Sequence, residues 1–231
     1  MSAHQVPSTF DALATLVRVT LRRLTRGRAV WVCVGIALLP SLIAVLFNHS
    51  SHIFDVITAA QMFVLVLLPP VFVAASIGEE IEERTTTYLW SRPIPRWTII
   101  VGKLVALAPI ATALVVVGWV LAVQAALSRT ASTDSLLALA AGALAISIMS
   151  AGLATIAPKQ GMVLAIIYLV LIDLAIGILP ASLQNISVTR QVTLMIGLDE
   201  PAQRLRPLIT MAIIAGVWLG VGLLRLRRRE S

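Results

Sequence analysis

Residues 136–179 read LLALAAGALAISIMSAGLATIAPKQGMVLAIIYLVLIDLAIGIL, and this stretch decides the fold class. It contains two apolar runs, 136–157 and 162–179, separated only by Pro158-Lys159-Gln160-Gly161. A helix needs roughly 20 apolar residues to cross the hydrocarbon core of a bilayer. The polar tetrapeptide, with proline and glycine at its ends, is typical of a tight turn. The stretch therefore predicts a helical hairpin that crosses a membrane twice.

Four further apolar runs of similar length lie on either side of this hairpin. They are residues 29–47, 53–76, 101–127 and 208–224. Together the six runs predict an all-α membrane protein with six transmembrane helices, folded as a single transmembrane domain over residues 1–231.

The composition supports a membrane protein. The chain has 231 residues, of which 58% are hydrophobic and 13% charged, and its mean hydropathy is +0.95. A soluble domain carries about 25% charged residues, so too little charge is present to cover a water-exposed surface. The net charge of +7 does not indicate a nucleic-acid partner, because the charges occur in short clusters between apolar runs. The single cysteine, Cys33, can form no intrachain disulfide.

The positions of the basic residues predict the orientation. Fourteen of the 18 Lys and Arg residues precede the first span, follow the sixth, or lie between spans two and three or four and five, when Lys103 at the start of span three is included. Cytoplasmic segments retain positive charge, so both termini are expected in the cytoplasm. A cleaved signal peptide is not expected, because the first apolar run starts near residue 29 and is longer than a signal core.

Residues 1–28 have a helical pattern of their own. Apolar side chains recur at spacings of three and four, and arginines gather toward the end of the segment. This pattern favours an amphipathic helix on the cytoplasmic membrane surface, with arginines near lipid phosphates. The alternative is that the first span simply has a basic flank. The apolar positions are Phe10, Leu13, Val17, Leu21 and Leu24.

Residues 77–100, between spans two and three, carry an unusual set of side chains. An acidic run is followed by the apolar patch Tyr88, Leu89 and Trp90, and then by a bend that Pro93 and Pro95 impose. Trp97 and Lys103 are expected to anchor the next span at the headgroup level. An ordinary loop has no need for such an acidic and apolar surface, which therefore indicates a docking partner. The acidic residues are Glu79, Glu80, Glu82 and Glu83.

These residues resemble a known family signature. Glu82-Glu83-Arg84-Thr85, then Leu89-x-Ser91-Arg92-Pro93-Ile94-Pro95-Arg96, with Gly102-Lys103 at the start of the next span, is similar to the cytoplasmic motif of type-2 exporter permeases of ABC transporters. The six spans and the long connection at 181–207 also fit, so the resemblance covers nearly the whole chain. Arg84 departs from the pattern, because many members have glycine before the threonine.

The resemblance implies that a coupling helix in this connection docks on a separate ATP-binding subunit, present in two copies, which holds ATP and Mg. It also implies a second copy of this chain or a related permease, and a place in the bacterial inner membrane. The chain has no ATPase site of its own, since Gly102-Lys103 is followed by Leu104 and no P-loop is formed. It is therefore expected to be a transport subunit, with no cofactor or metal of its own, and not an enzyme. The coupling residues would be Glu82, Glu83, Arg84, Thr85, Tyr88, Leu89, Arg92, Pro93 and Arg96.

Polar residues and prolines inside the spans are candidates for the transport pathway. Asp173 lies 11 residues after Met162, near the middle of its span, and either faces a pathway or bonds a neighbouring helix. Gln61 has the same two interpretations. Pro69 and Pro70 should kink or unwind the second span, as a hinge or as a static packing feature.

Small residues recur at four-residue spacing in two of the spans. Ala143, Ser147 and Ala151 in span four, and Gly216-x-x-x-Gly220 in span six, are read as helix-packing positions, with a dimer interface as the alternative. The resemblance implies short outer helices at 181–207.

The only histidines, at 4, 49 and 52, lie outside the spans, which disfavours an intramembrane hydrolase. A channel or a membrane scaffold remains the alternative function, and the docking surface is what disfavours it.

Overall fold

The structure is a computed structural model that describes residues 9–26, 28–47, 49–82, 97–179, 182–197 and 204–228. Every regular element within these residues is a helix. In chain order the elements are α1 (Thr9–Arg26), α2 (Arg28–Ala37), α3 (Leu39–Leu46), α4 (Ile53–Glu82), α6 (Trp97–Leu127), α7 (Thr133–Ile156), η1 (Pro158–Gln160), α8 (Gly161–Ile167), η2 (Tyr168–Asp173), α9 (Leu174–Ile178), η3 (Ser182–Ile186), α10 (Val188–Ile196) and α11 (Leu205–Arg228). The η2 segment is a π-helix.

Five of the six predicted spans are present as helices long and apolar enough to cross a membrane. They cover Ile53–Ile77, Ile100–Leu127, Thr133–Ile156, Gly161–Ile178 and Leu205–Arg225. Each agrees with its predicted run to within three residues at either end. The helical hairpin predicted for residues 136–179 is therefore confirmed. It consists of α7, the short turn η1, and the continuous helical run from α8 to α9.

The first predicted span, residues 29–47, stays a prediction. The apolar segment Val30–Leu46 is shorter than the other spans and is divided at Leu38 into α2 and α3. Pro40 lies in the first turn of α3 and has no backbone N–H to donate to the preceding turn. The helix therefore restarts just before this proline, and the six-span count is not established.

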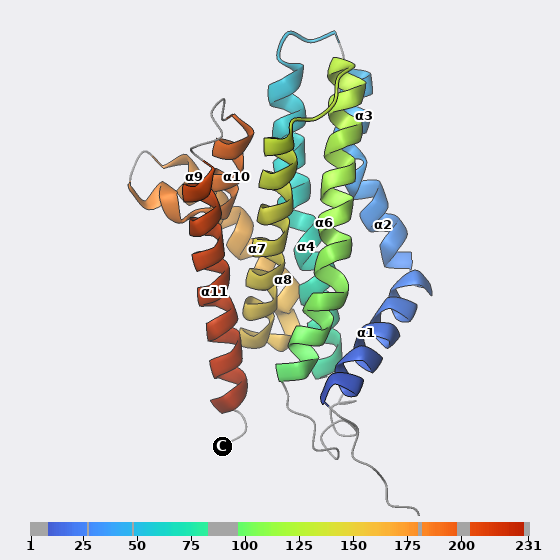
Figure 1. Cartoon of the computed structure of the whole chain (residues 1–231), viewed down its shortest axis with the longest axis vertical. Helices are drawn as coiled ribbons and strands as arrows, with labels where there is room; N and C mark the ends of the chain where they lie inside the picture. Colours follow the sequence, from blue (N-terminus) through green and yellow to red (C-terminus); the bar gives the residue numbers. More distant parts are fainter. Residues whose placement is uncertain are drawn as a thin grey trace, which may run out of the picture.

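The helices form an elongated bundle whose two ends differ (Figure 1). At one end, called here the α1 end, α1 begins, α4 ends, α6 begins and α11 ends. At the other, called the α10 end, α4 begins, α6 ends, α7 begins, and α10 lies beside α9. The start of the first described helix and the end of the last therefore lie on the same side of the bundle.

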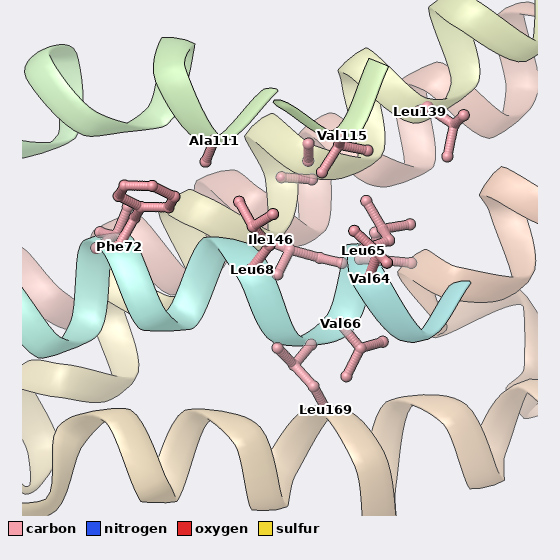
Figure 2. Packing of buried hydrophobic residues seen from close by; sticks show 14 of the residues in the cluster. Val64, Leu65, Val66, Leu68, Phe72, Ala111, Val115, Leu139, Ile146 and Leu169 are labelled. Carbon is pink, nitrogen blue, oxygen red and sulfur yellow. The ribbon is translucent and has the colours of Figure 1, made fainter. Parts of the chain in front are cut away.

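Helices α4 and α7 form the centre of the core. Of the residues in their most apolar parts, 61% and 67% are buried, against 22% in α11. Figure 2 shows Val64, Leu65 and Leu68 on one side of α4 and Val66 facing Leu169 on another. Helix α7 in turn packs against α4, α6, α8, α10 and α11. Between them, α4 and α7 contact helices from α2 at the start of the chain to α11 at its end.

Glycines allow the closest approaches between helices. A Cβ at Gly142 would lie 2.4 Å from Cγ2 of Val192 in α10, and one at Gly152 would lie 2.5 Å from the carbonyl oxygen of Trp218 in α11. Such distances are shorter than any ordinary contact, so neither position has room for a larger residue. The small face of α7 is thus a packing surface, as predicted, and Ala143, Ser147 and Ala151 on it are fully buried.

The packing interpretation of Gly216 and Gly220 is wrong within this chain. A Cβ at either glycine would meet nothing within 4 Å. The close contact between α11 and α7 uses Gly222 instead, where a Cβ would lie 3.3 Å from Cα of Gly152. The Gly216-x-x-x-Gly220 face of α11 is left open.

Candidate functional site

The α1 end of the bundle places Lys103 inside the protein. Its side chain is only 2% exposed, and its ammonium donates a hydrogen bond to the backbone carbonyl of Ser76. The prediction that Lys103 anchors the span at the headgroup level is therefore wrong. The reason is tertiary, because α4 packs along α6 and covers the lysine. Lys103 joins the last turns of α4 to the first turns of α6.

Helix α1 packs on the same part of α6. A Cβ at Gly102, next to Lys103, would lie 3.5 Å from Cβ of Leu16, an ordinary contact distance. On α1, Val17, Leu21 and Leu24 are partly buried against the core, while Arg18 and Val19 are exposed. The helical periodicity predicted for residues 1–28 is thus present over Thr9–Arg26, with one apolar face turned toward the bundle.

The predicted coupling residues fall almost wholly outside the described residues. Glu82 is the last residue of α4, and only its backbone is described. The structure therefore defines the two helices that flank the coupling region, and the residues between them remain a sequence-based hypothesis. The residues outside the described part are Glu83, Arg84, Thr85, Tyr88, Leu89, Arg92, Pro93 and Arg96.

Pro69 and Pro70 lie inside a continuous helix. Helix α4 runs from Ile53 to Glu82 through both prolines, and both are buried. The alternative in which they unwind the span is therefore wrong. Each proline still removes a backbone donor, so the carbonyls of Leu65 and Val66 lack their usual helical partners. The core around this turn, including Leu65, Val66 and Leu68, is fully packed and holds the helix together.

Gln61 bonds a neighbouring helix. The side chain is completely buried in α4, and its Nε2 donates to the backbone carbonyl of Val115 in α6 at 2.9 Å. Its Oε1 is buried and has no hydrogen-bond partner among the described residues. The hydroxyl of Thr112, one turn before Val115, is likewise buried without a partner there. This part of the α4–α6 contact therefore contains two buried oxygen atoms, Oε1 of Gln61 and Oγ1 of Thr112, without a hydrogen-bond partner among the described residues.

Asp173 lies at the end of the π-helical segment η2 and is 4% exposed. Its Oδ1 accepts a hydrogen bond from the backbone N–H of Val188 at 2.8 Å. Its Oδ2 accepts from the backbone N–H of Thr189 at 3.0 Å, from the Thr189 hydroxyl at 2.7 Å and from the Ser187 hydroxyl at 3.3 Å. Both oxygens are thus bound to the N-terminus of α10, where a negative charge is stabilising. The geometry favours the helix-bonding interpretation over a pathway role.

Gln61 and Asp173 bond different neighbours. Gln61 is bonded to α6, whereas Asp173 is bonded to the start of α10. Neither the spacing of the apolar residues nor the position of either polar residue within its span predicts these partners.

The connection at 181–207 contains two short helices in its described part, η3 and α10. Ser187 caps α10, since its side chain accepts from the backbone N–H of Arg190 at 3.1 Å. Val188, Val192 and Met195 of α10 are fully buried. These apolar residues therefore belong to a helix that packs on α7 and α11.

An ion pair at the α10 end was missed by sequence reasoning. Nη2 of Arg204 donates to Oδ2 of Asp134 at 2.7 Å, and Nε of the same arginine lies 2.5 Å from Oδ1. Ser132 caps α7, and Asp134 lies in its first turn, a pattern that predicts a helix start. The sequence shows no signal for the pairing itself, because 70 residues separate the two partners.

Comparison with known protein families identifies the chain. Residues 16–181 match the model of the ABC-2 family transporter proteins, which is well over half of the sequence. The chain belongs to the ABC-2 transporter family. This confirms the resemblance drawn from the connection between α4 and α6 and its surrounding spans. ABC-2 permeases are membrane subunits of ABC transporters, and the multi-pass helical bundle agrees with that assignment. No curated protein matches the chain.

Proposed function

We propose that this ABC-2 family protein is the permease subunit of an ATP-driven exporter in a bacterial inner membrane. It would form the substrate pathway with a second permease, either another copy or a related chain, and would be driven by two copies of an ATP-binding subunit. ATP and Mg would be held by that subunit. The observation that carries the proposal is the family match over residues 16–181.

The arrangement of the α1 end supports this proposal. Helices α4 and α6 flank the predicted coupling region and are joined by the Lys103 hydrogen bond, with Leu16 of α1 against Gly102. A force applied between Glu82 and Trp97 would therefore act on α1, α4 and α6 together. In the proposed orientation this end, where α1 begins and α11 ends, faces the cytoplasm, and α1 lies at the membrane surface.

A path for transmitting this force runs along α4. The helix extends from the coupling region to the opposite end of the bundle and packs on α7. Pro69 and Pro70 remove two helical hydrogen bonds within this path. We therefore assign them the hinge at which α4 bends when the ATP-binding subunits close. Gln61, with its unused acceptor, is retained as the candidate pathway residue on the same helix.

The α10 end provides the outer cap. Helices η3 and α10 are tied to the fifth span through Asp173 and to α7 through Val192 at Gly142. They would close the pathway on the outer side. The open Gly216-x-x-x-Gly220 face of α11 is suited to close approach by the second permease, because small residues let helices pack tightly in a membrane.

The test is purification of the tagged full chain from its native membrane, followed by mass spectrometry. An ABC ATP-binding subunit should copurify, and its ATPase activity should depend on the permease after reconstitution in vesicles. A reconstituted chain that conducts ions without any ATPase would instead support the channel. Copurification with other membrane proteins but no ATPase would support the scaffold.

A further inference from the structure

A cavity of about 320 Å³ opens at the α10 end of the bundle. Five parts of the chain surround it, namely the start of α4, the end of α6, the connection from α6 to α7, the start of α7, and the end of α10. Its volume lies at the lower end of the range of small-molecule sites in proteins, about 300–1,000 Å³. The cavity therefore has room for a small ligand or for one end of a longer one.

One side of the cavity is apolar and aromatic. Phe54 meets Trp119 edge to face, with ring centroids 6.1 Å apart, and Val123 and Ile196 extend the same wall. Trp119 is 1% exposed and Phe54 is 41% exposed, so the wall runs from the buried core toward the surface. Such a wall accepts an apolar or aromatic group.

The polar groups deepest in the cavity are already bonded to one another. The indole N–H of Trp119 donates to the hydroxyl of Ser135 at 2.9 Å, and that hydroxyl donates to the backbone carbonyl of Ser132 at 2.8 Å. This network leaves no charge in the cavity floor. Selectivity for charge must therefore come from the residues at its rim.

Arg129 supplies a positive charge at that rim. None of the described residues lining the cavity is acidic. Among the described carboxylates, Asp134 is paired with Arg204. Asp55 is 81% exposed and does not line the cavity. The guanidinium of Arg129 has no ion-pair partner within the described part of the chain. It is left for an anionic group, to which arginine binds well through several N–H donors.

The backbone at Ser128 places this arginine. Ser128 has φ of 51°, a left-handed conformation that is uncommon for a residue other than glycine. It ends α6, with its N–H bonded to the carbonyl of Gln124 at 3.0 Å, and turns the chain so that residues 129–132 line the cavity. A left-handed residue just after the last turn is a common way for a helix to end, and here it sets the course of the connection that follows.

We infer that this cavity is a binding site for an anionic amphiphile, whose apolar body lies against Phe54 and Trp119 and whose anionic group is held by Arg129. The ligand is either a free organic anion or the headgroup region of an anionic lipid, which share this chemistry. The inference does not depend on the proposed transport function, because it concerns binding by this chain alone.

The test measures binding to the full chain in phosphatidylcholine nanodiscs, without nucleotide or ATP-binding subunit. Three probes of similar shape are titrated by calorimetry: naphthalene-2-sulfonate, neutral 2-naphthylmethanol, and cationic 2-naphthylmethyl-trimethylammonium. The sulfonate should bind about tenfold more tightly than the neutral probe, the range expected for a hydrogen bond to a charged group. Arg129→Gln should abolish this preference, whereas Arg206→Gln, an exposed arginine that does not line the cavity, should keep it.

Filling the cavity tests its position. Ala131→Phe and Ile196→Trp enter it from different elements, and each should weaken binding of all three probes. Using both variants separates a blocked site from a folding defect in one of them. Equal binding of the sulfonate and the neutral probe would overturn the inference. So would unchanged binding in both cavity-filling variants, or a charge preference that survives Arg129→Gln.

Replacing part of the phosphatidylcholine by phosphatidylglycerol identifies the source of the ligand. Repulsion by the anionic disc lowers sulfonate affinity equally for the wild type and Arg129→Gln. An additional loss confined to the wild type would mean that lipid headgroups compete for Arg129. Equal losses would assign the site to a free organic anion. Both results support the site and differ only in its occupant.

Discussion

Oδ2 of Asp173 accepts two hydrogen bonds from Thr189, one from the backbone N–H at 3.0 Å and one from the hydroxyl at 2.7 Å. The pair joins the π-helical segment of the fifth span to the first turn of α10. The carboxylate satisfies backbone donors that the start of a helix leaves without intrahelical partners. The most polar residue of the span therefore holds the outer segment in place.

Asp173→Asn should release α10. The amide presents an NH₂ group toward backbone donors in place of one acceptor oxygen, and the buried donors lose their partner. We expect a loss of about 1–3 kcal/mol in the stability of this contact. Amide hydrogen exchange should rise in Val188–Ile196 and stay unchanged in α6.

Asp55→Asn is the control for this variant, because Asp55 is 81% exposed and should show no effect. Exchange in α10 that remains at the wild-type level, together with altered transport in Asp173→Asn, would restore a direct pathway role for Asp173.

Gly152→Ala and Gly216→Ala should have opposite effects on thermal stability. The first places a Cβ 2.5 Å from the Trp218 carbonyl oxygen and forces α7 and α11 apart, at a cost of about 1–3 kcal/mol. The second meets nothing within 4 Å and gains helix propensity of about 0.5–1 kcal/mol. Thermal unfolding of the purified monomer measures both. Equal destabilisation by the two variants would contradict the packing described for α11.

Bulky residues on the open face of α11 should weaken association of permeases. We expect Gly216→Leu combined with Gly220→Leu to reduce crosslinked dimer in vesicles by about tenfold, with the monomer's unfolding temperature retained. Gly35→Leu on α2 is the matched control, because a Cβ there also meets nothing within 4 Å. Loss of dimer in the control alone would move the interface to α2.

Lys103→Met should loosen the contact between α4 and α6. The substitution keeps most of the side-chain volume and removes the donor to the Ser76 carbonyl, with an expected loss of about 1–3 kcal/mol. Lys159→Met, at an exposed lysine in the turn before α8, is the control. Unfolding temperatures of the two variants in detergent provide the comparison. Equal stability of both would show that the buried lysine adds nothing to the contact.

Glu83→Ala and Arg96→Ala should uncouple the transporter. Both residues belong to the predicted coupling region, so membrane insertion should be retained while stimulation of the partner ATPase falls by about tenfold or more. ATPase activity and transport are measured in vesicles that contain the partner subunit. Arg206→Ala, at the opposite end of the bundle, should behave as the wild type. Full stimulation in both coupling variants would reject the assignment of this region.

The sequence by itself determined that the protein lies in a membrane, that it is helical, and where five of the six predicted spans lie. A run of about 20 apolar residues has one stable solution in a bilayer, because every backbone N–H and C=O must be bonded within the segment. It also indicated the ABC-2 family, through the residues around Glu82–Arg96 and the spans beside them. These properties are local or compositional, so no knowledge of tertiary contacts was needed.

Only the tertiary structure decided which polar residues face which neighbours. Lys103 resembles a headgroup anchor until α4 covers it, and Asp173 resembles a pathway residue until α10 folds back onto it. The glycines show the same limit, since Gly152 is packed and Gly216 is open although both lie in apolar helices. The physical reason is that a membrane-embedded helix is mostly apolar on every face, whether that face meets lipid or protein. The sequence pattern therefore marks that a helix spans the bilayer, and the rotation of each helix is set by packing against its neighbours.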